Sequence, residues 1–487
     1  MNHDERLLAQ VCPQGWRNPE PAPLYDLVVI GGGTAGLVCA AGAAGLGARV
    51  AIVERHRLGG DCLNTGCVPS KALLHAARAV HDARRASGAG VSMTPQVDFA
   101  AVMESVRARR ADLAQHDSAQ RLTSIGAHVF LGVASFTAPT AMSVDGRALK
   151  FRRAVIATGS RPAIPPIPGL SGLPYLTSEN VFEIRELPRS LLLIGGGSIG
   201  CELAQAFALL GTAVTLVEAG PRLLPREDRD AAEIVRQRLA ADGVRVLAGA
   251  SVRGCAQEGR HVSAAFDTER VQAEAVLVAV GRRPNTEGLM LEAAGVEAGE
   301  RGVVVDDRLR TSNRRIFAAG DVCSSYQFTH AADAMARIVI QNALFHGRRR
   351  ASALVIPWAT YTFPEVAHVG PAPEEAARLG ADTVTVQLSD VDRAVIDAET
   401  GGFLRIHHRQ GRILAATLVA PHAGELIGQV ASLMRRGGSL ADFSSDIFPY
   451  PTFADVLRKA GDAYRRTRLT PRARALLERY FAFRRRF

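Results

Sequence analysis

The sequence predicts an α/β fold with two Rossmann-like domains and a C-terminal α+β domain. An internal repeat points to the first two: residues 28–54 and 192–218 align without a gap, with 12 of 27 positions identical. Each copy reads as a buried strand, a glycine-rich turn, an alanine-rich helix and a second strand. Residues 403–406 and 413–419 resemble strands, which predicts an antiparallel sheet with helices in the third. A chain of 487 residues is also too long for one core.

The glycine-rich turns follow the spacing G-x-G-x-x-G. The first glycine forms the turn, the second lets the backbone approach a pyrophosphate, and the third lets the helix pack on the strand. A glutamate 18 residues past the last glycine can accept hydrogen bonds from ribose hydroxyls. One such turn is a weak signal, whereas two matched copies predict two dinucleotide sites. The residues are Gly31, Gly33, Gly36 and Glu54 in the first copy, and Gly195, Gly197, Gly200 and Glu218 in the second.

A pair of cysteines, Cys62 and Cys67, follows the first copy closely. The segment from Val68 resembles a helix start, with Pro69 in the first turn. A helix N-terminus favours the reactive thiolate. The alternatives are a structural disulfide or half of a zinc site, but zinc needs a second ligand pair that the sequence lacks. We therefore predict a redox-active disulfide and no resident metal.

The order of these features assigns the two nucleotides. The copy next to the cysteines would hold the electron carrier, a flavin, and the second copy a nicotinamide donor. Glu218 would repel a 2′-phosphate, which favours NADH over NADPH. Arg222, four residues later, weakens that preference.

Composition and charge exclude several classes of protein. The hydrophobic content of 47% and charged content of 22% are those of a soluble globular protein. Most of the net charge of +10 lies in residues 458–487, with eleven Lys and Arg against two acids, so the basic balance does not indicate nucleic acid. The cysteine usage suits a reducing cytoplasm, and neither a signal peptide nor a membrane span is readable.

The sequence also predicts the ends of the first two domains and one more strand. A strand ending at residues 157–160 leaves the first domain through a proline-rich linker, and residues 278–281 repeat that exit after the second. Residues 316–321 read as a buried strand ending in an acid, followed by a helix from about His330 to Phe345.

Together, these motifs resemble the two-cysteine flavoprotein disulfide reductases, which include dihydrolipoamide dehydrogenase, glutathione reductase and mercuric reductase. The resemblance runs from Tyr25 to about Tyr464. It implies an FAD-binding domain over residues 25–168 and 292–350, an NAD(P)-binding domain over 169–291 and a dimerisation domain over 351–470. An N-terminal extension over 1–24 and a basic tail helix over 471–487 complete the organisation. A homodimer is implied, with each active site completed by the partner.

The resemblance also implies roles for single residues. Cys67 would lie against the flavin and Cys62 would be the interchange thiol, while Lys71 and Glu202 would form an ion pair beside flavin N5. Ile199 would gate the nicotinamide face and Asp321 would bind the ribityl chain. The helix that starts near His330 would direct its N-terminal dipole at the flavin. Gly60, Ala134, Thr158, Gly159, Gly281 and Ala331 are further cofactor-binding candidates.

Several of these residues also have a purely structural interpretation. Lys71 would otherwise be a solvated helix residue, and His330 would merely cap its helix. Glu202, on an apolar helix, would be a costly buried carboxylate without a cation.

The sequence departs from the family's pattern at the residues that would act on the electron acceptor. In family members that act on disulfide substrates a histidine is the acid/base, and here Tyr450 stands in its place, with Asp455 near the orienting acid. Tyrosine is a poor base at neutral pH. Residues 392–394 resemble the mercuric reductase branch, yet the chain has no cysteine beyond Cys323 to pass metal.

The expected function is therefore a mercuric-reductase-like enzyme that passes a hydride from NAD(P)H through FAD to the Cys62–Cys67 disulfide. The acceptor is a small molecule, a disulfide or a metal ion. The alternatives are a dihydrolipoamide dehydrogenase with an altered base and a redox-responsive membrane-docking flavoprotein. The second draws on the tail, where residues 473–481 suit a basic amphipathic helix at a membrane surface. The other reading of the tail is a helix packed on the dimer.

Overall fold

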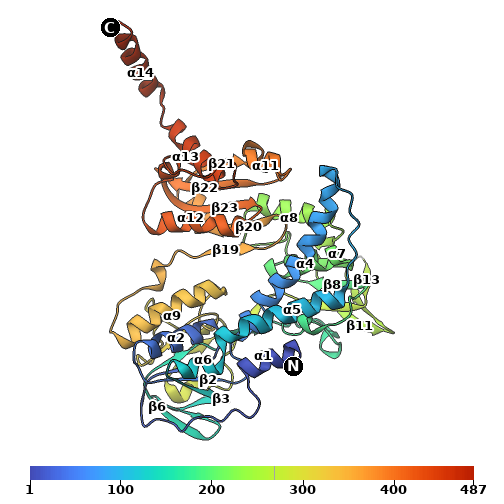
Figure 1. The fold of residues 1–487 in the computed structure, drawn as a ribbon, viewed down its shortest axis with the longest axis vertical. Coiled ribbons are helices and arrows are strands. Elements are labelled where there is room, and N and C mark those ends of the chain that lie inside the picture. Colours follow the sequence, from blue (N-terminus) through green and yellow to red (C-terminus); the bar gives the residue numbers. More distant parts are fainter. Residues whose placement is uncertain (268, 487) are drawn as a thin grey trace. The chain divides into compact units, whose positions relative to one another are not determined.

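The computed structural model describes residues 1–267 and 269–486 (Figure 1). The chain divides into two compact units, Met1–Ala219 with Gly243–Leu354 and Gly220–Asp242 with Val355–Phe487. The domain boundaries expected from the sequence stay predictions.

A seven-stranded sheet forms the centre of the first unit, in the order β3-β2-β1-β6-β5-β4 with β18 also paired to β6. The pairs β1–β2, β2–β3, β1–β6 and β6–β18 are parallel, whereas β4, β5 and β6 form an antiparallel meander. Strands β1, β2 and β18 are almost entirely buried, as their apolar runs require, whereas β6 is continuously buried only at its C-terminal end. The strands are β1 (Tyr25–Ile30), β2 (Val50–Glu54), β3 (Ala127–Leu131), β4 (Ala134–Ala138), β5 (Ala141–Val144), β6 (Arg147–Ile156) and β18 (Ile316–Ala318).

A second, four-stranded parallel sheet has the order β10-β9-β8-β14. A three-stranded antiparallel sheet and a two-stranded pair accompany it in the same unit. The parallel strands are β8 (Ser190–Ile194), β9 (Ala213–Glu218), β10 (Arg245–Ala248) and β14 (Ala275–Val278). The antiparallel sheet consists of β11 (Gly254–Glu258), β12 (His261–Ala265) and β13 (Arg270–Ala273), and the pair of β7 (Ser160–Pro162) and β15 (Arg282–Pro284).

The two copies of the internal repeat have the same construction. The amide of Gly31 donates to the Val53 carbonyl, and that of Gly195 to the Val217 carbonyl, each over 2.8 Å. A Cβ on Gly31 would lie 2.3 Å from the Ala157 oxygen, and one on Gly195 would lie 2.4 Å from the Ala279 oxygen. Both glycines also have positive φ, so each turn tolerates glycine alone. The predicted pair of Rossmann-like sheets is confirmed.

Helices cover these sheets and carry the candidate site residues. The repeat helices are α2 (Thr34–Gly45) and α7 (Ser198–Leu210), and α9 (Thr329–Leu344) packs on α2. Helix α4 (Cys67–Arg85) packs against α7 and against α5 (Phe99–Leu113), which in turn contacts α1 (His3–Val11). The starts of α4 and α9 lie within one residue of those predicted.

The second unit contains the antiparallel sheet predicted for the C-terminal part, in the order β19-β20-β23-β22-β21. Helix α12 (Ala423–Arg435) packs on it, as do α13 (Asp455–Thr467) and α8 (Arg229–Ala241). The tail forms α14 (Pro471–Arg484), in which no described residue is buried. The strands are β19 (Pro357–Thr360), β20 (Glu365–Val369), β21 (Asp382–Gln387), β22 (Phe403–Arg409) and β23 (Arg412–Ala420). Within residues 1–267 and 269–486, none of the helices combines the length and apolar character needed to cross a bilayer.

Candidate active site

The two cysteines lie on consecutive helices joined by a tight turn. Cys62 is in the middle of the short helix α3 (Gly60–Asn64), and Cys67 is the first residue of α4. Gly60 has φ +54°, and a Cβ there would lie 2.6 Å from the Cα of Gly33 in the first glycine-rich turn. This close approach holds the cysteine segment against the predicted pyrophosphate site, and only glycine permits it.

The thiols differ strongly in acidity. A hydrogen bond from the Cys62 thiol is the main cause that lowers the pKa of Cys67 to about 6. The Thr329 hydroxyl, 3.2 Å from Cys67 Sγ, and the charge of Lys71 act in the same direction, against partial burial. The bond to Cys67 and burial raise the pKa of Cys62. Cys67 is thus the thiolate at neutral pH and Cys62 keeps its proton.

The variant Thr329→Val is expected to raise the pKa of Cys67 above its value of about 6, because the thiolate loses a hydrogen bond. Thiolate reactivity is present above the pKa and is lost as the pH falls through it. The pH profile of Cys67 alkylation, followed by peptide mass, measures the change. Ser70→Ala is the matched control, since that hydroxyl donates to the Cys67 carbonyl instead of its sulfur. An unchanged profile in Thr329→Val would show that the hydroxyl does not tune the thiol.

Lys71 and Glu202 form the expected ion pair. Lys71 Nζ on α4 donates to Glu202 Oε2 on α7 over 2.7 Å. The carboxylate side chain is 7% exposed, so the pair supplies the cation that a buried glutamate needs. The reading of Lys71 as a merely solvated residue is therefore wrong.

Arg282 connects the cysteine segment to Asp321, an arrangement that sequence analysis missed. Its Nη2 lies 2.6 Å from Asp61 Oδ2, next to Cys62, and its Nε lies 3.7 Å from Asp321 Oδ2. Ser160 donates to Asp321 over 2.7 Å. Burial raises the pKa of the Asp321 carboxyl, although Ser160 and Arg282 oppose this. No local signal in the Gly-Arg-Arg-Pro run at 281–284 separates Arg282 from Arg283, which pairs with Glu287 instead.

The glycine-rich turns fit dinucleotides. Gly33 and Gly197 are the N-cap residues of α2 and α7, and neither helix has a side-chain acceptor at its N-cap among the described residues. A Cβ on Gly197 would meet nothing within 4 Å in the described part of the chain. The first-turn amides of α2 and α7 therefore donate to no N-cap side chain, which suits a phosphate. Glu54 and Glu218 accept from the Gly32 and Gly196 amides over 2.6 and 2.7 Å, at the edges of these turns.

The other candidate cofactor residues occupy several places in the first unit. Thr158 donates to the Asn285 carbonyl over 2.6 Å, and Gly159 accepts from the Asn285 amide, so this exit loop is joined to the one that contains Gly281. Ala134 is buried at the start of β4 and Ile199 lies exposed on the first turn of α7. His330 is stacked on Phe328 at the start of α9, with Ala331 buried behind it.

Tyr450 belongs to the second unit. Its hydroxyl donates to Asp392 Oδ2 over 2.9 Å, and this bond raises the pKa of Tyr450. Lys459 lies 3.5 Å from Asp455 and 4.0 Å from Asp392, so the carboxylate that accepts from the tyrosine is itself paired with a cation. The side chain remains a proton donor at neutral pH and is not a base.

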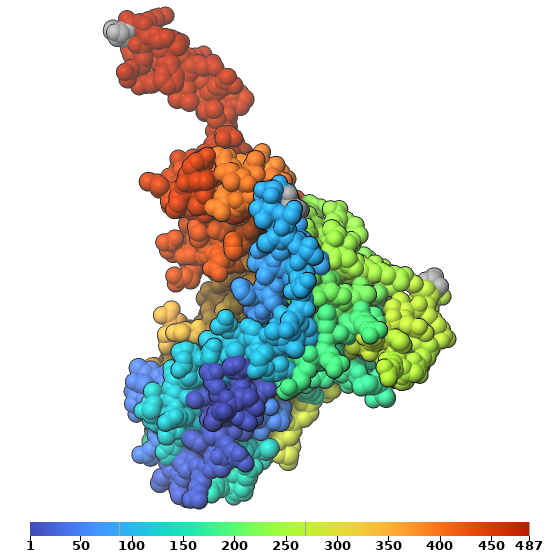
Figure 2. All heavy atoms as spheres, turned by 45° about the vertical axis from the view of Figure 1, so that its right-hand side comes forward, coloured from blue at the N-terminus to red at the C-terminus, as the bar shows by residue number. Residues whose placement is uncertain are grey.

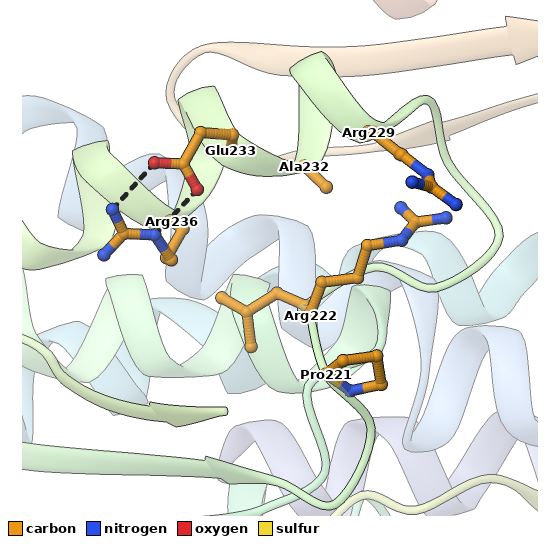
Figure 3. A pocket seen from close by; sticks show the side chains of 7 residues that line it. Pro221, Arg222, Arg229, Ala232, Glu233 and Arg236 are labelled. Atoms are coloured by element: carbon orange, nitrogen blue, oxygen red, sulfur yellow. Dashed lines mark hydrogen bonds and ion pairs between the residues drawn. The ribbon is translucent and has the colours of Figure 1, made fainter. Parts of the chain in front are cut away.

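A pocket of about 310 Å³ follows the second repeat copy, on the second unit (Figure 3). Figure 3 shows Arg222 reaching toward Arg229 and Glu233 paired with Arg236. Arg222 donates to the Leu224, Pro225 and Glu227 carbonyls over 2.9–3.2 Å. Its guanidinium is thus engaged in folding its own loop. The pocket is lined by Pro221, Arg222, Leu223, Arg229, Ala232, Glu233 and Arg236.

An acidic thiol that accepts a hydrogen bond from a second thiol, close to a nucleotide-binding turn, defines the class of nucleotide-dependent thiol–disulfide oxidoreductases. Comparison with known proteins agrees. Residues 25–336 match the family model of the pyridine nucleotide-disulphide oxidoreductases, and residues 356–460 match the dimerisation domain of that family.

Relatives and solved structures agree with the family models. Mercuric reductase of Staphylococcus aureus is 35% identical over 90% of this chain and 82% of its own length. Dihydrolipoyl dehydrogenase of Thermus scotoductus is 34% identical over 90% of this chain and 97% of its own length. The HOCl-induced flavoprotein disulfide reductase RclA from Escherichia coli superimposes with a TM-score of 0.81 and 31% identity, over 89% of this chain and 99% of that one. A Cu(II) complex of RclA superimposes with a TM-score of 0.80 and 30% identity, over 89% of this chain and 98% of that one.

The chain belongs to the pyridine nucleotide-disulphide oxidoreductase family. It is accordingly a flavin-dependent enzyme of that class, and the family binds FAD and a pyridine nucleotide. The dimerisation domain supports a homodimer.

Proposed function

We propose that the chain passes two electrons from NADH to the Cys62–Cys67 disulfide and from the dithiol to a thiophilic metal ion, Cu(II) or Hg(II). FAD, when bound, carries the hydride equivalent between the nicotinamide and the disulfide. The observation that carries the proposal is the acidic Cys67 thiolate beside the protonated Cys62 thiol, because this is the reduced form of a dithiol couple ready to give up electrons.

The chain's own residues have distinct roles in this proposal. The first glycine-rich turn, with Glu54, Thr158, Gly159 and Asp321, would hold FAD. The second, with Glu218 and Ile199, would hold the nicotinamide nucleotide. Lys71, fixed by Glu202, would place a positive charge where negative charge develops on reduction. Gly60, Ala134, Gly281, His330 and Ala331 remain proposed cofactor contacts.

A metal acceptor fits the acceptor side better than dihydrolipoamide does. Proton transfer to or from a dithiol substrate needs a base near neutral pH, and the bond to Asp392 holds Tyr450 protonated. Metal reduction needs no such base, because the bound ion acidifies the Cys62 thiol and its proton leaves to water. The two thiolates then hold the ion and release two electrons to it. The mercuric reductase relatives and the copper complex of RclA support this choice. The charge balance is one disulfide formed for two Cu(II) reduced to Cu(I), or for one Hg(II) reduced to Hg(0).

The donor is expected to be NADH, with an efficiency at least about tenfold above that for NADPH. Glu218 would repel a 2′-phosphate, and Arg222 is engaged by three carbonyls of its own loop. Replacing Glu218 by alanine should narrow the ratio of the two kcat/KM values. A wild-type preference for NADPH would contradict this assignment.

The assay that tests the function follows nucleotide oxidation by purified holoenzyme with Cu(II), Hg(II), quinones, disulfides and, in reverse, dihydrolipoamide. We expect turnover with at least one of the two metal ions that exceeds dihydrolipoamide turnover, and loss of it in Cys62→Ser. Rapid turnover of dihydrolipoamide would establish the alternative, a dihydrolipoamide dehydrogenase with an altered base. Slow nucleotide oxidation with every acceptor would favour a redox-responsive binding protein.

The protein is proposed to act in the cytoplasm, where a reducing environment keeps the dithiol available. A membrane contact by α14 is a separate hypothesis that the comparisons do not support. It rests on exposed apolar side chains such as Leu476 and Phe481 with arginines around them.

A further inference from the structure

The N-terminal extension is built into the core of the first unit, although the family model begins only at residue 25. Leu7 and Val11 on α1 are fully buried. Figure 2 shows the dark-blue N-terminal segment lying on the cyan surface to which α5 and α6 (Ala119–Ser124) belong. The Val11 carbonyl accepts from the Leu58 amide over 3.0 Å, directly before the cysteine segment. The extension therefore touches the chain that leads into Cys62.

A buried arginine on α5 makes the second connection to the cysteine segment. Arg110 is 1% exposed, and its Nη1 donates to the Asn64 carbonyl over 3.0 Å. Asn64 ends α3 and stands between Cys62 and Cys67. Its own side-chain amide donates to the Leu58 and Gly60 carbonyls over 3.1 and 2.8 Å. The main chain between the two thiols is thus held from both sides.

Two carboxylates hold the Arg110 guanidinium in place. Nη2 donates to Asp4 Oδ1 on α1 over 3.2 Å, and Nη1 donates to Glu183 Oε1 over 2.7 Å. Although burial opposes it, the bond to Arg110 lowers the pKa of Glu183, so this carboxyl is ionised at neutral pH. A buried guanidinium costs free energy that only well-aligned partners offset. The planar fork of an arginine provides the alignment with all three acceptors, which a lysine does not.

We propose that Asp4, Arg110 and Glu183 form a positioning clamp that fixes the Asn64 carbonyl and, through it, the separation of Cys62 and Cys67. The residues are positioning residues, because none touches a sulfur atom. The clamp makes the N-terminal extension part of the redox centre. This inference rests on the proposed function, in which the two cysteines form the redox couple.

The expected consequence is a change in the stability of the disulfide. Oxidised glutathione takes two electrons from the dithiol, so that Cys62–Cys67 forms as two reduced glutathione molecules are released. The equilibrium constant for this exchange reports the effective concentration of one thiol at the other. A looser segment lowers that effective concentration and so shifts the couple toward the dithiol.

The test titrates the holoenzyme in glutathione redox buffers and counts free thiols on Cys62 and Cys67 by alkylation and mass spectrometry. Arg110→Lys is expected to lower the equilibrium constant for disulfide formation about tenfold. Asp4→Ala should lower this equilibrium constant by a smaller factor, because Glu183 still holds Arg110. Asp4→Glu keeps the carboxylate and should leave the constant close to that of the wild type. The carboxylate of Asp4 is half-exposed, so its replacement keeps the test decisive if Arg110→Lys does not fold.

The matched control is Asp112→Ala. Asp112 on α5 pairs with Arg6 on α1 over 2.9 Å, which joins the same two helices without reaching Asn64. We expect wild-type titration in this variant. The clamp would be overturned if wild type, Asp4→Ala and folded Arg110→Lys had equal equilibrium constants for disulfide formation. It would also be overturned if Asp112→Ala shifted this constant as far as Asp4→Ala does. If the wild type forms no Cys62–Cys67 disulfide in any buffer, the proposed function fails instead.

Discussion

Replacing Cys67 by serine is expected to reduce NADH-dependent acceptor reduction by roughly a thousandfold or more. The lost sulfur is the one that exists as a thiolate, because the Cys62 thiol, Thr329 and Lys71 together stabilise its negative charge. Serine has no comparably acidic group and forms no disulfide. Anaerobic reduction by NADH should also give no long-wavelength thiolate–flavin absorbance. Steady-state rates and the anaerobic spectrum measure the two effects.

Cys62→Ser separates the roles of the two thiols. It should also abolish turnover, because no disulfide forms, yet it keeps the sulfur of Cys67. The introduced serine hydroxyl still offers a hydrogen bond, so a long-wavelength band should persist. If the band were kept in Cys67→Ser and absent in Cys62→Ser, the two assignments would have to be exchanged.

Removing Lys71 is expected to have the second largest effect. Lys71→Met leaves the buried Glu202 carboxylate without its lysine, which should lower the free energy of unfolding by about 2 kcal/mol. The figure lies below that for a fully buried pair because the lysine is partly exposed. Flavin reduction by NADH should slow by about a hundredfold if the lysine stands where charge develops. Denaturant unfolding and stopped-flow absorbance give the two numbers.

A double replacement distinguishes charge pairing from catalysis. Lys71→Met with Glu202→Leu should recover most of the lost stability, because the buried carboxylate is removed together with its lysine. The rate of flavin reduction should stay low. Recovery of both quantities would mean that the pair serves stability alone. Arg6→Met, which breaks the exposed pair with Asp112, is the control and should leave both close to wild type.

The sequence predicted the fold well because the repeat encodes it locally. Glycines at fixed spacing between apolar strands and alanine-rich helices leave few alternatives, since Gly31 and Gly195 occupy conformations that other residues rarely adopt. The same holds for the starts of α4 and α9, which local signals mark. The ion pair of Lys71 with Glu202 was found through a family resemblance, since 131 residues separate its members.

Contacts between segments that lie far apart in the sequence could not be predicted from local patterns. Thr329 reaches Cys67 across 262 residues, and Arg282 meets Asp61 only because β15 and α3 converge. Arg110 looks in the sequence like one of several arginines on a helix, yet it is buried and Arg109 is exposed. Side-chain chemistry alone did not distinguish them.

By itself, the sequence determined the two nucleotide-binding turns, the pair of cysteines and the absence of a histidine at position 450. These follow from spacing, because turns, helix starts and neighbouring thiols are local features of the backbone. Only the tertiary structure decided which groups lower the pKa of Cys67, that Arg282 pairs with Asp61 and what holds the chain between the cysteines. The acidity of a thiol and the cost of a buried charge depend on groups brought close in space, and no local pattern records them.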